Sequence, residues 1–367
     1  MDHKQNLSKY YLALFLLVMG VNYFTHAAFF NRQYELFAFM DNIWVFTSLS
    51  AYPLYYYYIR LLTSDLKIDW RKSWILLPSL ILLAFSFVVY FAMSPEELGI
   101  FIHGVMYHEP GYIKPYPPLV QLQVLRTVLF KVVFLIQLFI SVYFSYHLVN
   151  RYNKELNEFY SNTGGKDLSH LKYLLLAFIF ASVVSSISSV VGKEYFIDKG
   201  VLLIIPSFMH SLCLFFIGYV GYHQHFTIVD FTKDVNDFKT KELIVNTEKK
   251  RSTSKSKIIK EQLSNLLEKE ELFKNPELRI TDITYMLGTN RTYISNIVNE
   301  EMQTNFCDWV NSFRIDYAKK AMRDPEFENL SLLQIAEMSG FSSLSVFYRA
   351  FKAREGVAPG EFKSRKS

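Results

Sequence analysis

Long apolar runs without charged side chains recur through the first 229 positions of the chain. There are six, at residues 10–31, 42–59, 73–95, 132–150, 173–192 and 200–229. A helix that crosses a bilayer needs roughly 20 apolar residues, and each run holds one such stretch. The fourth is expected to start a turn earlier, with Lys131 near one end, where its stem can reach the interface. The pattern predicts six membrane-spanning helices. An all-helical soluble core is the alternative, and the charged loops between the runs disfavour it.

The basic residues of the connecting loops indicate the orientation. Ten Lys and Arg residues lie in the N-terminus and in the second and fourth loops, and five lie in the other loops. Because cytoplasmic loops carry the excess of Lys and Arg, the N-terminus is predicted to be inside. An even number of spans then places the C-terminus inside as well. No cleavable signal peptide is predicted, because the first apolar run is long and lacks a clear small-residue cleavage site.

After residue 229 the apolar runs give way to amphipathic periodicity and a duplicated motif. Residues 278–288 align with residues 330–340, which lie 52 positions later. In each copy a short helix is predicted to end near a Gly, and a turn of three or four residues leads to a second amphipathic helix. Two helices joined in this way form a helix-turn-helix unit, whose second helix enters the DNA major groove.

Further helices are predicted around and between the two copies. Residues 258–272 form an opening helix, and Asn305 with Asp308 begins a long helix that joins the units. The buried stripe of that long helix is expected at Phe306, Trp309, Val310, Phe313, Tyr317 and Ala321. Ser331 and Gln334 have the spacing of a capping box at the start of the second copy.

The last recognition helix is predicted at residues 343–354, after a turn at Gly340. Its inward face is expected to hold Phe347, Ala350 and Phe351. Its outward face is expected to hold Leu344, Ser345, Tyr348, Arg349 and Lys352. Small side chains beside an Arg suit the reading of base edges, because Arg pairs bidentately with guanine.

A longer sequence pattern in this region indicates a family. The pattern reads Ile335-Ala336-(x3)-Gly340-Phe341-(x3)-Ser345-x-Phe347-x-Arg349-x-Phe351-Lys352-(x3)-Gly356-(x2)-Pro359-(x2)-Phe362-Lys363. It continues upstream in Asn290-Arg291-Thr292-Tyr293-Ile294-Ser295 and in Phe306, Val310, Arg314-Ile315 and Ala318. Residues 258–367 therefore resemble the DNA-binding domain of AraC/XylS-type transcription regulators.

This resemblance implies a seven-helix domain in which a rigid helix joins two recognition helices. The DNA readers that it implies are Asn290, Thr292, Ser295 and Asn296 in the first unit and Leu344, Ser345 and Arg349 in the second. Lys352 is expected to contact phosphate. Two positions depart from the pattern: Arg279 stands where Ser331 stands in the second copy, and Thr284 replaces a small apolar residue. We expect the first unit to be less stable or less specific than the second.

The apolar half resembles the membrane-anchored branch of these regulators, found in bacteria such as Bacteroidetes. The expected architecture is all-α, with a six-helix transmembrane bundle at residues 1–229, a charged linker at 230–257 and the seven-helix tandem helix-turn-helix domain at 258–367. The expected location is the bacterial inner membrane, with both termini in the cytoplasm. The basic cluster that ends the linker could be flexible chain, a contact with lipid headgroups or an arm near DNA. Residues 230–245 could instead form a helix that extends the sixth span.

Charge and cysteine content narrow the functional classes. Residues 227–367 hold 23 Lys and Arg against 21 Asp and Glu, which excludes a polycation that binds nucleic acid by charge alone. Cys213 and Cys307 indicate neither a disulfide framework nor a zinc site. No P-loop, G-x-S-x-G, H-E-x-x-H or kinase motif occurs, so no enzyme activity, catalytic residue, metal or cofactor is expected.

Polar residues in the apolar half are candidates for a ligand site. They lie in the first span, in a third loop predicted at residues 94–126, and at the start of the fourth span: Asn22, His26, His103, His108 and Arg126. The alternatives are interhelical hydrogen bonds in the spans and aromatic anchoring in the loop. Serines at helical spacing in the fifth span favour close helix packing and a homodimer: Ser182, Ser185, Ser186 and Ser189.

We therefore expect a membrane-bound, sequence-specific DNA-binding transcription regulator that senses a small-molecule or envelope signal through its spans. Its expected partners are double-stranded promoter DNA, membrane lipid, RNA polymerase and a second copy of the chain. A transporter or membrane receptor whose DNA-binding tail is only a regulatory appendage is the alternative. Residues 1–226 show no clear internal repeat of the kind that transporters have, which disfavours that alternative. A protein that is anchored without sensing a signal is a further alternative.

Overall fold

The protein is all-helical in the part of the chain that the computed structural model describes, residues 7–191, 194–197, 201–246 and 256–364. No strand occurs among these residues. They group into two compact units. The apolar unit comprises Met1–Asn150 and Leu168–Ile228, and the C-terminal unit comprises Arg151–Asp167 and Val229–Ser367. The predicted domain boundaries at residues 229 and 257 stay a prediction.

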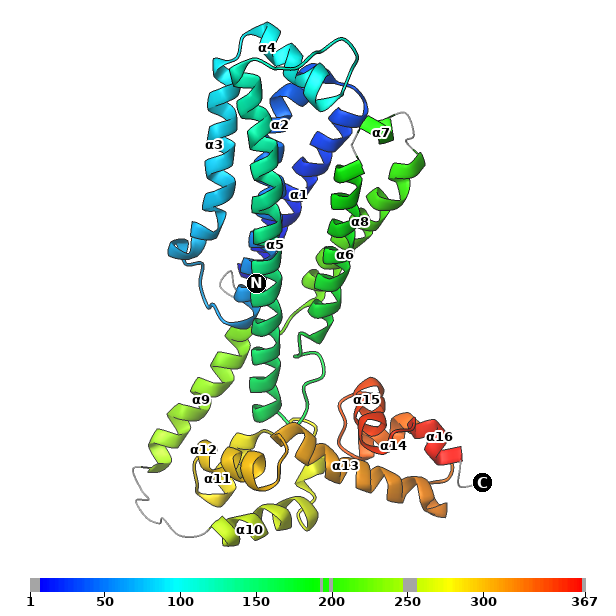
Figure 1. The fold of residues 1–367 in the computed structure, drawn as a ribbon. Coiled ribbons are helices and arrows are strands. Elements are labelled where there is room, and N and C mark those ends of the chain that lie inside the picture. Colours follow the sequence, from blue (N-terminus) through cyan, green and yellow to red (C-terminus); the bar gives the residue numbers. More distant parts are fainter. Residues whose placement is uncertain (1–6, 192–193, 198–200, 247–255, 365–367) are drawn as a thin grey trace. The chain divides into compact units, whose positions relative to one another are not determined.

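Long helices form the apolar unit. They and the shorter helices between them are α1 (Leu7–Phe30), α2 (Tyr34–Thr63), the 3-10 helix η1 (Trp70–Leu76), α3 (Leu77–Ala92), α4 (Pro95–Gly99), the π-helical turn η2 (Ile100–Met106), most of α5 (Pro118–Phe159), α6 (Ser169–Val191), α7 (Glu194–Ile197) and α8 (Val201–His223). α2 packs against α1 and α3, while α8 packs against α1 and α6. The long helices run side by side (Figure 1).

Four helical stretches are long and apolar enough to cross a membrane. They are Leu7–Phe30, Arg71–Ala92, Pro118–Phe159 and Ile204–Asp237, and a shorter apolar helix covers Ser169–Val184. Within the described residues α2 is not among the four, and it carries the charged residues Glu35, Asp41 and Arg60. The all-helical fold is thus confirmed, whereas the six-helix transmembrane bundle stays a prediction.

The third loop is shorter than we predicted from the sequence. We expected it to extend to residue 126, but α5 begins at Pro118, where proline is tolerated because the first turn of a helix needs no amide hydrogen bond. In the structure Arg126 is buried, and its Nη2 lies 2.7 Å from Oδ2 of Asp41. The carboxylate balances the cation, so the helix passes through this position.

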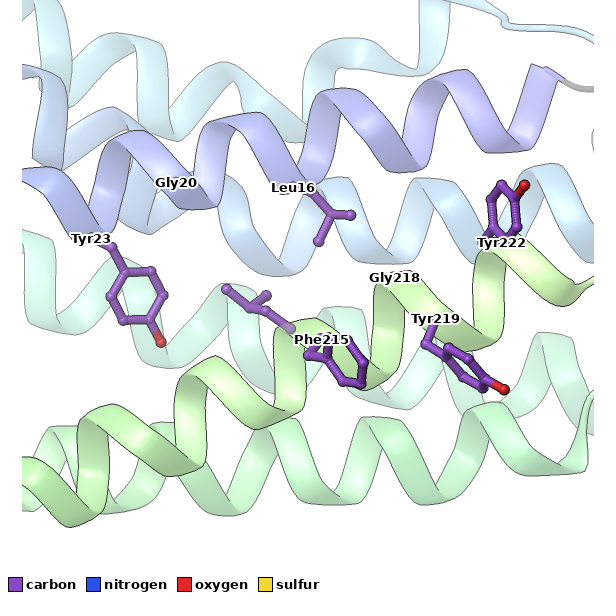
Figure 2. A pocket seen from close by; sticks show the side chains of 8 residues that line it. Leu16, Gly20, Tyr23, Phe215, Gly218, Tyr219 and Tyr222 are labelled. Atoms are coloured by element: carbon purple, nitrogen blue, oxygen red, sulfur yellow. The ribbon is translucent and has the colours of Figure 1, made fainter.

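The outer surface of the apolar unit is strongly hydrophobic. Large side chains are exposed on several of its helices, including Leu17, Phe91, Phe139 and Phe208. An open groove of about 520 Å³ lies between α1 and α8, with apolar and aromatic side chains along it (Figure 2). Soluble proteins rarely expose contiguous apolar patches of more than a few hundred Å². This surface is typical of contact with lipid.

The C-terminal unit is built around a helix that joins two groups of shorter helices. Its elements are the end of α5, α9 (Ile228–Asn246), α10 (Ser256–Glu268), η3 (Leu272–Lys274), α11 (Ile280–Leu287), α12 (Arg291–Asn296), the π-helical turn η4 (Ile297–Glu301), α13 (Phe306–Arg323), η5 (Pro325–Phe327), α14 (Leu332–Met338), α15 (Leu344–Glu355) and α16 (Pro359–Ser364). α11 and α12 lie toward one end of α13, and α14, α15 and α16 lie toward the other (Figure 1).

Two sequence predictions fall partly outside the described residues. The connector is helical over α9, and the non-helical residues 224–227 separate this helix from α8. The candidate span Ile204–Asp237 includes residues of both helices. Most of the basic cluster at residues 249–257 lies outside the described part of the chain.

The serines at helical spacing in the fifth predicted span lie on α6. Ser182 is buried and donates to the carbonyl oxygen of Phe178 at 2.9 Å. The side chains of the other three serines lie outside the described part.

Candidate nucleic-acid interface

The turn of the second helix-turn-helix unit depends on Gly340. α14 begins with the predicted capping box: the Ser331 hydroxyl accepts from the Gln334 amide at 3.2 Å, and the Gln334 side-chain oxygen accepts from the Ser331 amide at 2.9 Å. Gly340 then adopts a left-handed φ of 85°. A Cβ at this position would lie 2.4 Å from the carbonyl oxygen of Phe273. The turn therefore needs a glycine for its conformation and for its close approach to η3.

α15 presents one face to a hydrophobic core. Ser343 caps the helix by accepting from the Val346 amide at 3.4 Å. Phe347 and Phe351 are fully buried, as predicted, among side chains from α13, α14 and the turn. Leu344 was predicted to face outward, but it is half-buried and packs against this core. The apolar first residue of the helix thus contributes more to packing than we expected.

The opposite face of α15 is exposed and polar. Ser345, Arg349 and Lys352 are all exposed, as predicted. The hydroxyl oxygens of Ser343 and Ser345 lie 3.0 Å apart. The Arg349 side chain is 60% exposed, and its Nη1 lies 3.7 Å from Oδ2 of Asp167. This face can therefore offer a guanidinium, an ammonium and a hydroxyl to the base edges and phosphates of a nucleic acid groove.

The first helix-turn-helix unit accommodates both of its departures from the family pattern. The Arg279 side chain does not cap α11; Asp282 instead accepts from the Arg279 amide at 2.8 Å. Thr284 is buried, and its hydroxyl donates to the carbonyl oxygen of Thr281 at 2.7 Å. The helix ends at Gly288, whose φ is 59°. Each departure has a local hydrogen bond that offsets part of its cost.

The predicted readers of the first unit lie on α12 and its cap. Thr292 and Asn296 are exposed. Asn290 is exposed as well, but its side-chain oxygen accepts from the Tyr293 amide at 2.8 Å and so caps the helix. Ser295 is half-buried and accepts from Nδ2 of Asn299 at 3.2 Å. Of the four predicted readers of this unit, Asn290 thus caps the helix and Ser295 is bonded to Asn299. Thr292 and Asn296 are the two exposed readers that do neither.

The joining helix α13 contains a buried arginine that the predicted stripe omitted. Asn305 caps the helix as predicted and accepts from the Asp308 amide at 2.9 Å. Phe313 and Tyr317 are only half-buried, whereas Arg314 is completely buried. Arg314 belongs to the family pattern, which could have indicated its importance. The periodicity of apolar residues could not, because it assigns an arginine to the surface. The guanidinium can lie in the interior because oxygen acceptors surround it there.

Five oxygen atoms surround the Arg314 guanidinium. Nε donates to the carbonyl oxygen of Phe273 at 2.7 Å. Nη1 donates to the carbonyl oxygen of Ser161 at 2.8 Å and to Oδ1 of Asn311 at 3.2 Å. Nη2 donates to the Ser161 hydroxyl at 3.0 Å and to the carbonyl oxygen of Asn275 at 2.8 Å. Burial lowers the pKa of Arg314 to about 10, so the group stays charged at neutral pH.

The predicted ligand residues of the apolar unit make internal contacts. Asn22 donates to the hydroxyls of Thr47 and Ser48 at 3.1 and 2.6 Å. His26 Nε2 accepts from the indole N–H of Trp44 at 3.1 Å. These bonds join α1 to α2, as the interhelical alternative predicts.

Arg126 and the loop histidines lie in two further clusters. Arg126 pairs with Asp41, which also accepts from the Tyr90 hydroxyl at 2.9 Å. His103 Nδ1 lies 2.9 Å from Oε2 of Glu109, and His108 has a left-handed φ of 52°. No group of three His, Cys, Asp or Glu side chains that could hold a metal is found among the described residues.

Comparison with known proteins concerns the C-terminal unit. Residues 283–365 match the family model described as a helix-turn-helix domain, which is of the AraC type. Two solved structures cover 29% of the chain with a TM-score of 0.26: a Listeria innocua protein of unknown function at 27% identity, and the C-terminal domain of the response regulator YesN from Fusobacterium nucleatum at 22% identity. The match includes 96% and 97% of those two chains.

Two curated regulators are similar in sequence to part of this chain. The uncharacterised HTH-type transcriptional regulator YtdP of Bacillus subtilis is 28% identical over 147 residues, which are 40% of this chain and 18% of that protein. The TCP pilus virulence regulatory protein of Vibrio cholerae is 38% identical over 84 residues, which are 23% of this chain and 29% of that protein. The chain thus spans less than a third of the length of either relative. Its C-terminal region is similar to AraC-type helix-turn-helix domains of transcription regulators.

Proposed function

We propose that the protein is a membrane-bound transcription regulator of the AraC type, which binds promoter DNA through α12 and α15. The observation that carries this proposal is the pair of helix-turn-helix units joined by α13, each with an exposed polar face on its second helix. The similarity of residues 283–365 to a helix-turn-helix domain supports the same conclusion. In such units the second helix lies in the major groove, so α12 and α15 would each read a segment of DNA.

The apolar unit supports the membrane part of the proposal. Four apolar stretches are long enough to span, and the exposed surface of the unit is hydrophobic. An anchor needs only one span, so further spans indicate a second role, which we take to be the sensing of a signal. The location that follows is the inner membrane of a bacterium, with the C-terminal unit on the cytoplasmic side, where DNA is accessible.

Crosslinking in cells tests the two parts together. After formaldehyde treatment, the membrane fraction should contain the chain, and the DNA recovered with it should be enriched in discrete promoter segments. A variant with Arg349→Ala should remain in the membrane fraction but lose that enrichment. Recovery of the chain in the soluble fraction would contradict the membrane assignment. Recovery of DNA without preferred segments, with the fold intact, would contradict sequence-specific regulation.

A further inference from the structure

A short segment at the end of α5 lies inside the C-terminal unit. We call residues 159–167 the docking segment. Its first five residues, Phe159 to Thr163, are buried. The Ser161 amide donates to the carbonyl oxygen of Leu278 at 3.0 Å, and Tyr160 forms an isolated antiparallel bridge with Arg279. Loops usually run over the protein surface, because buried backbone groups need partners. In this protein the C-terminal unit supplies those partners.

The docking segment completes the environment of Arg314. Two of the five oxygens around the guanidinium belong to Ser161. Cys307 also lies against this residue, with its Sγ 3.5 Å from the Ser161 carbonyl oxygen. Without the segment, two N–H groups of a buried cation would lose their acceptors, which is among the costlier losses in a protein interior. The joining helix therefore favours the docked state.

The docking segment also contacts the first helix-turn-helix unit through its aromatic residues. The Tyr160 hydroxyl donates to Oδ2 of Asp234 at 2.5 Å, and Nη2 of Arg279 lies 3.2 Å from the same oxygen. The guanidinium of Arg291, at the start of α12, lies 5.0 Å from the ring centre of Phe159. The last turn of α5 is thereby joined to both helices of the first unit.

The other end of the docking segment reaches the second recognition helix. A Cβ on Gly164 would lie 2.8 Å from Cγ2 of Val346 and 3.2 Å from the Ser342 hydroxyl. Asp167 lies 3.7 Å from Arg349, the predicted base reader of α15. The carboxylate partly neutralises the positive charge that would otherwise attract a DNA phosphate, and it lies beside N–H donors from which a guanine edge would accept hydrogen bonds.

We propose that the docking segment is a built-in inhibitor of DNA binding: it is held by Arg314 and pairs with Arg349 through Asp167. The inference rests on the proposed function, since it assigns a regulator to the same interface. The segment continues directly from α5, which begins at Pro118 in the apolar unit. A rearrangement of α5 that withdraws the segment would free Arg349 and remove a negative charge from the DNA-binding face.

The competition is tested with the full chain in lipid nanodiscs and a preferred promoter fragment. Asp167→Asn should raise affinity about two- to fivefold, as expected for loss of a partly exposed ion pair. Asp316→Asn, which changes the charge equally but removes a partner of Arg354, serves as the matched control. The effect of Asp167→Asn should vanish when Arg349 is already Ala. The proposed competition would be overturned if Asp167→Asn raised the affinity for DNA no more than Asp316→Asn does. It would also be overturned if Asp167→Asn still raised the affinity in a chain with Arg349→Ala.

Docking is tested without DNA, by alkylation of Cys307 in a chain with Cys213→Ala. Burial raises the pKa of Cys307 to about 11, so its thiol should react slowly while the segment is docked. Ser161→Ala should speed the reaction roughly tenfold by favouring local opening. Ser312→Ala, which removes a hydroxyl bond within α13, should leave the rate unchanged.

An unchanged rate in Ser161→Ala would overturn the docking role. If no variant binds DNA selectively while Cys307 stays protected, the proposed function and the competition both fail, and only the docked arrangement stands.

Discussion

Two arginines of the C-terminal unit show how surroundings determine the role of a residue. Arg314 is completely buried, and all five of its N–H groups have oxygen acceptors. Arg349 is 60% exposed and has one carboxylate nearby. The first is a structural element of the joining helix, and the second is available to a ligand. Loss of Arg314 should therefore be detected as a loss of stability, and loss of Arg349 as a loss of DNA binding.

Arg314→Met should destabilise the C-terminal unit by about 2–4 kcal/mol, because it strands the surrounding carbonyl groups and removes several charged hydrogen bonds. Arg314→Lys should cost less, since three donors remain, although they lack the planar geometry of the guanidinium. Hydrogen exchange of the α13 amides in the full chain measures the loss. Arg323→Met, at an exposed position of the same helix, serves as the control and should change exchange little. Equal protection in Arg314→Met and in the control would contradict the structural role.

Two glycines that end helical elements with similar backbone angles should respond differently to substitution. Gly340 and Gly356 have φ values of 85° and 75°. A Cβ on Gly340 would meet the backbone of η3 at 2.4 Å, whereas one on Gly356 would meet nothing within 4 Å. Gly356→Ala should cost about 1 kcal/mol for the left-handed conformation alone. Gly340→Ala should cost at least about twice as much, because the clash is added. Hydrogen exchange of α14 and α15 compares them, and equal losses would contradict the close approach.

Local patterns predicted the elements of the C-terminal unit well. The capping residues Asn305 and Ser331 and the apolar pair Phe347 and Phe351 behave as their spacing predicts. Contacts between distant parts of the chain were missed. The partner of Arg126 lies 85 positions away, and Ser161 lies 153 positions from Arg314. Neither pairing leaves a periodic signal, so the start of α5 and the docking segment could not be predicted from the sequence.

The orientation of the protein in the membrane stays a prediction from loop charges. Lys154, near the end of α5, should be cytoplasmic, and Lys114, in the loop before α5, should be outside. Both side chains are exposed. Each can be replaced by Cys in a chain without Cys213 and Cys307. In intact cells a membrane-impermeant maleimide should label position 114 and not position 154, and both should react after lysis. Labelling of both positions in intact cells would contradict the predicted topology.

We propose that the C-terminal unit reads promoter sequence with its exposed recognition helices. The most direct test compares the base preferences of the full chain with those of two variants, by selection from a random DNA library in nanodiscs. Arg349→Ala should cost roughly 1–3 kcal/mol at one base pair and flatten preference there. Lys352→Ala should instead weaken all sequences alike and lower the salt dependence by about one counterion. Unchanged affinity and unchanged base preference in Arg349→Ala, with α15 still folded, would contradict base reading by this helix.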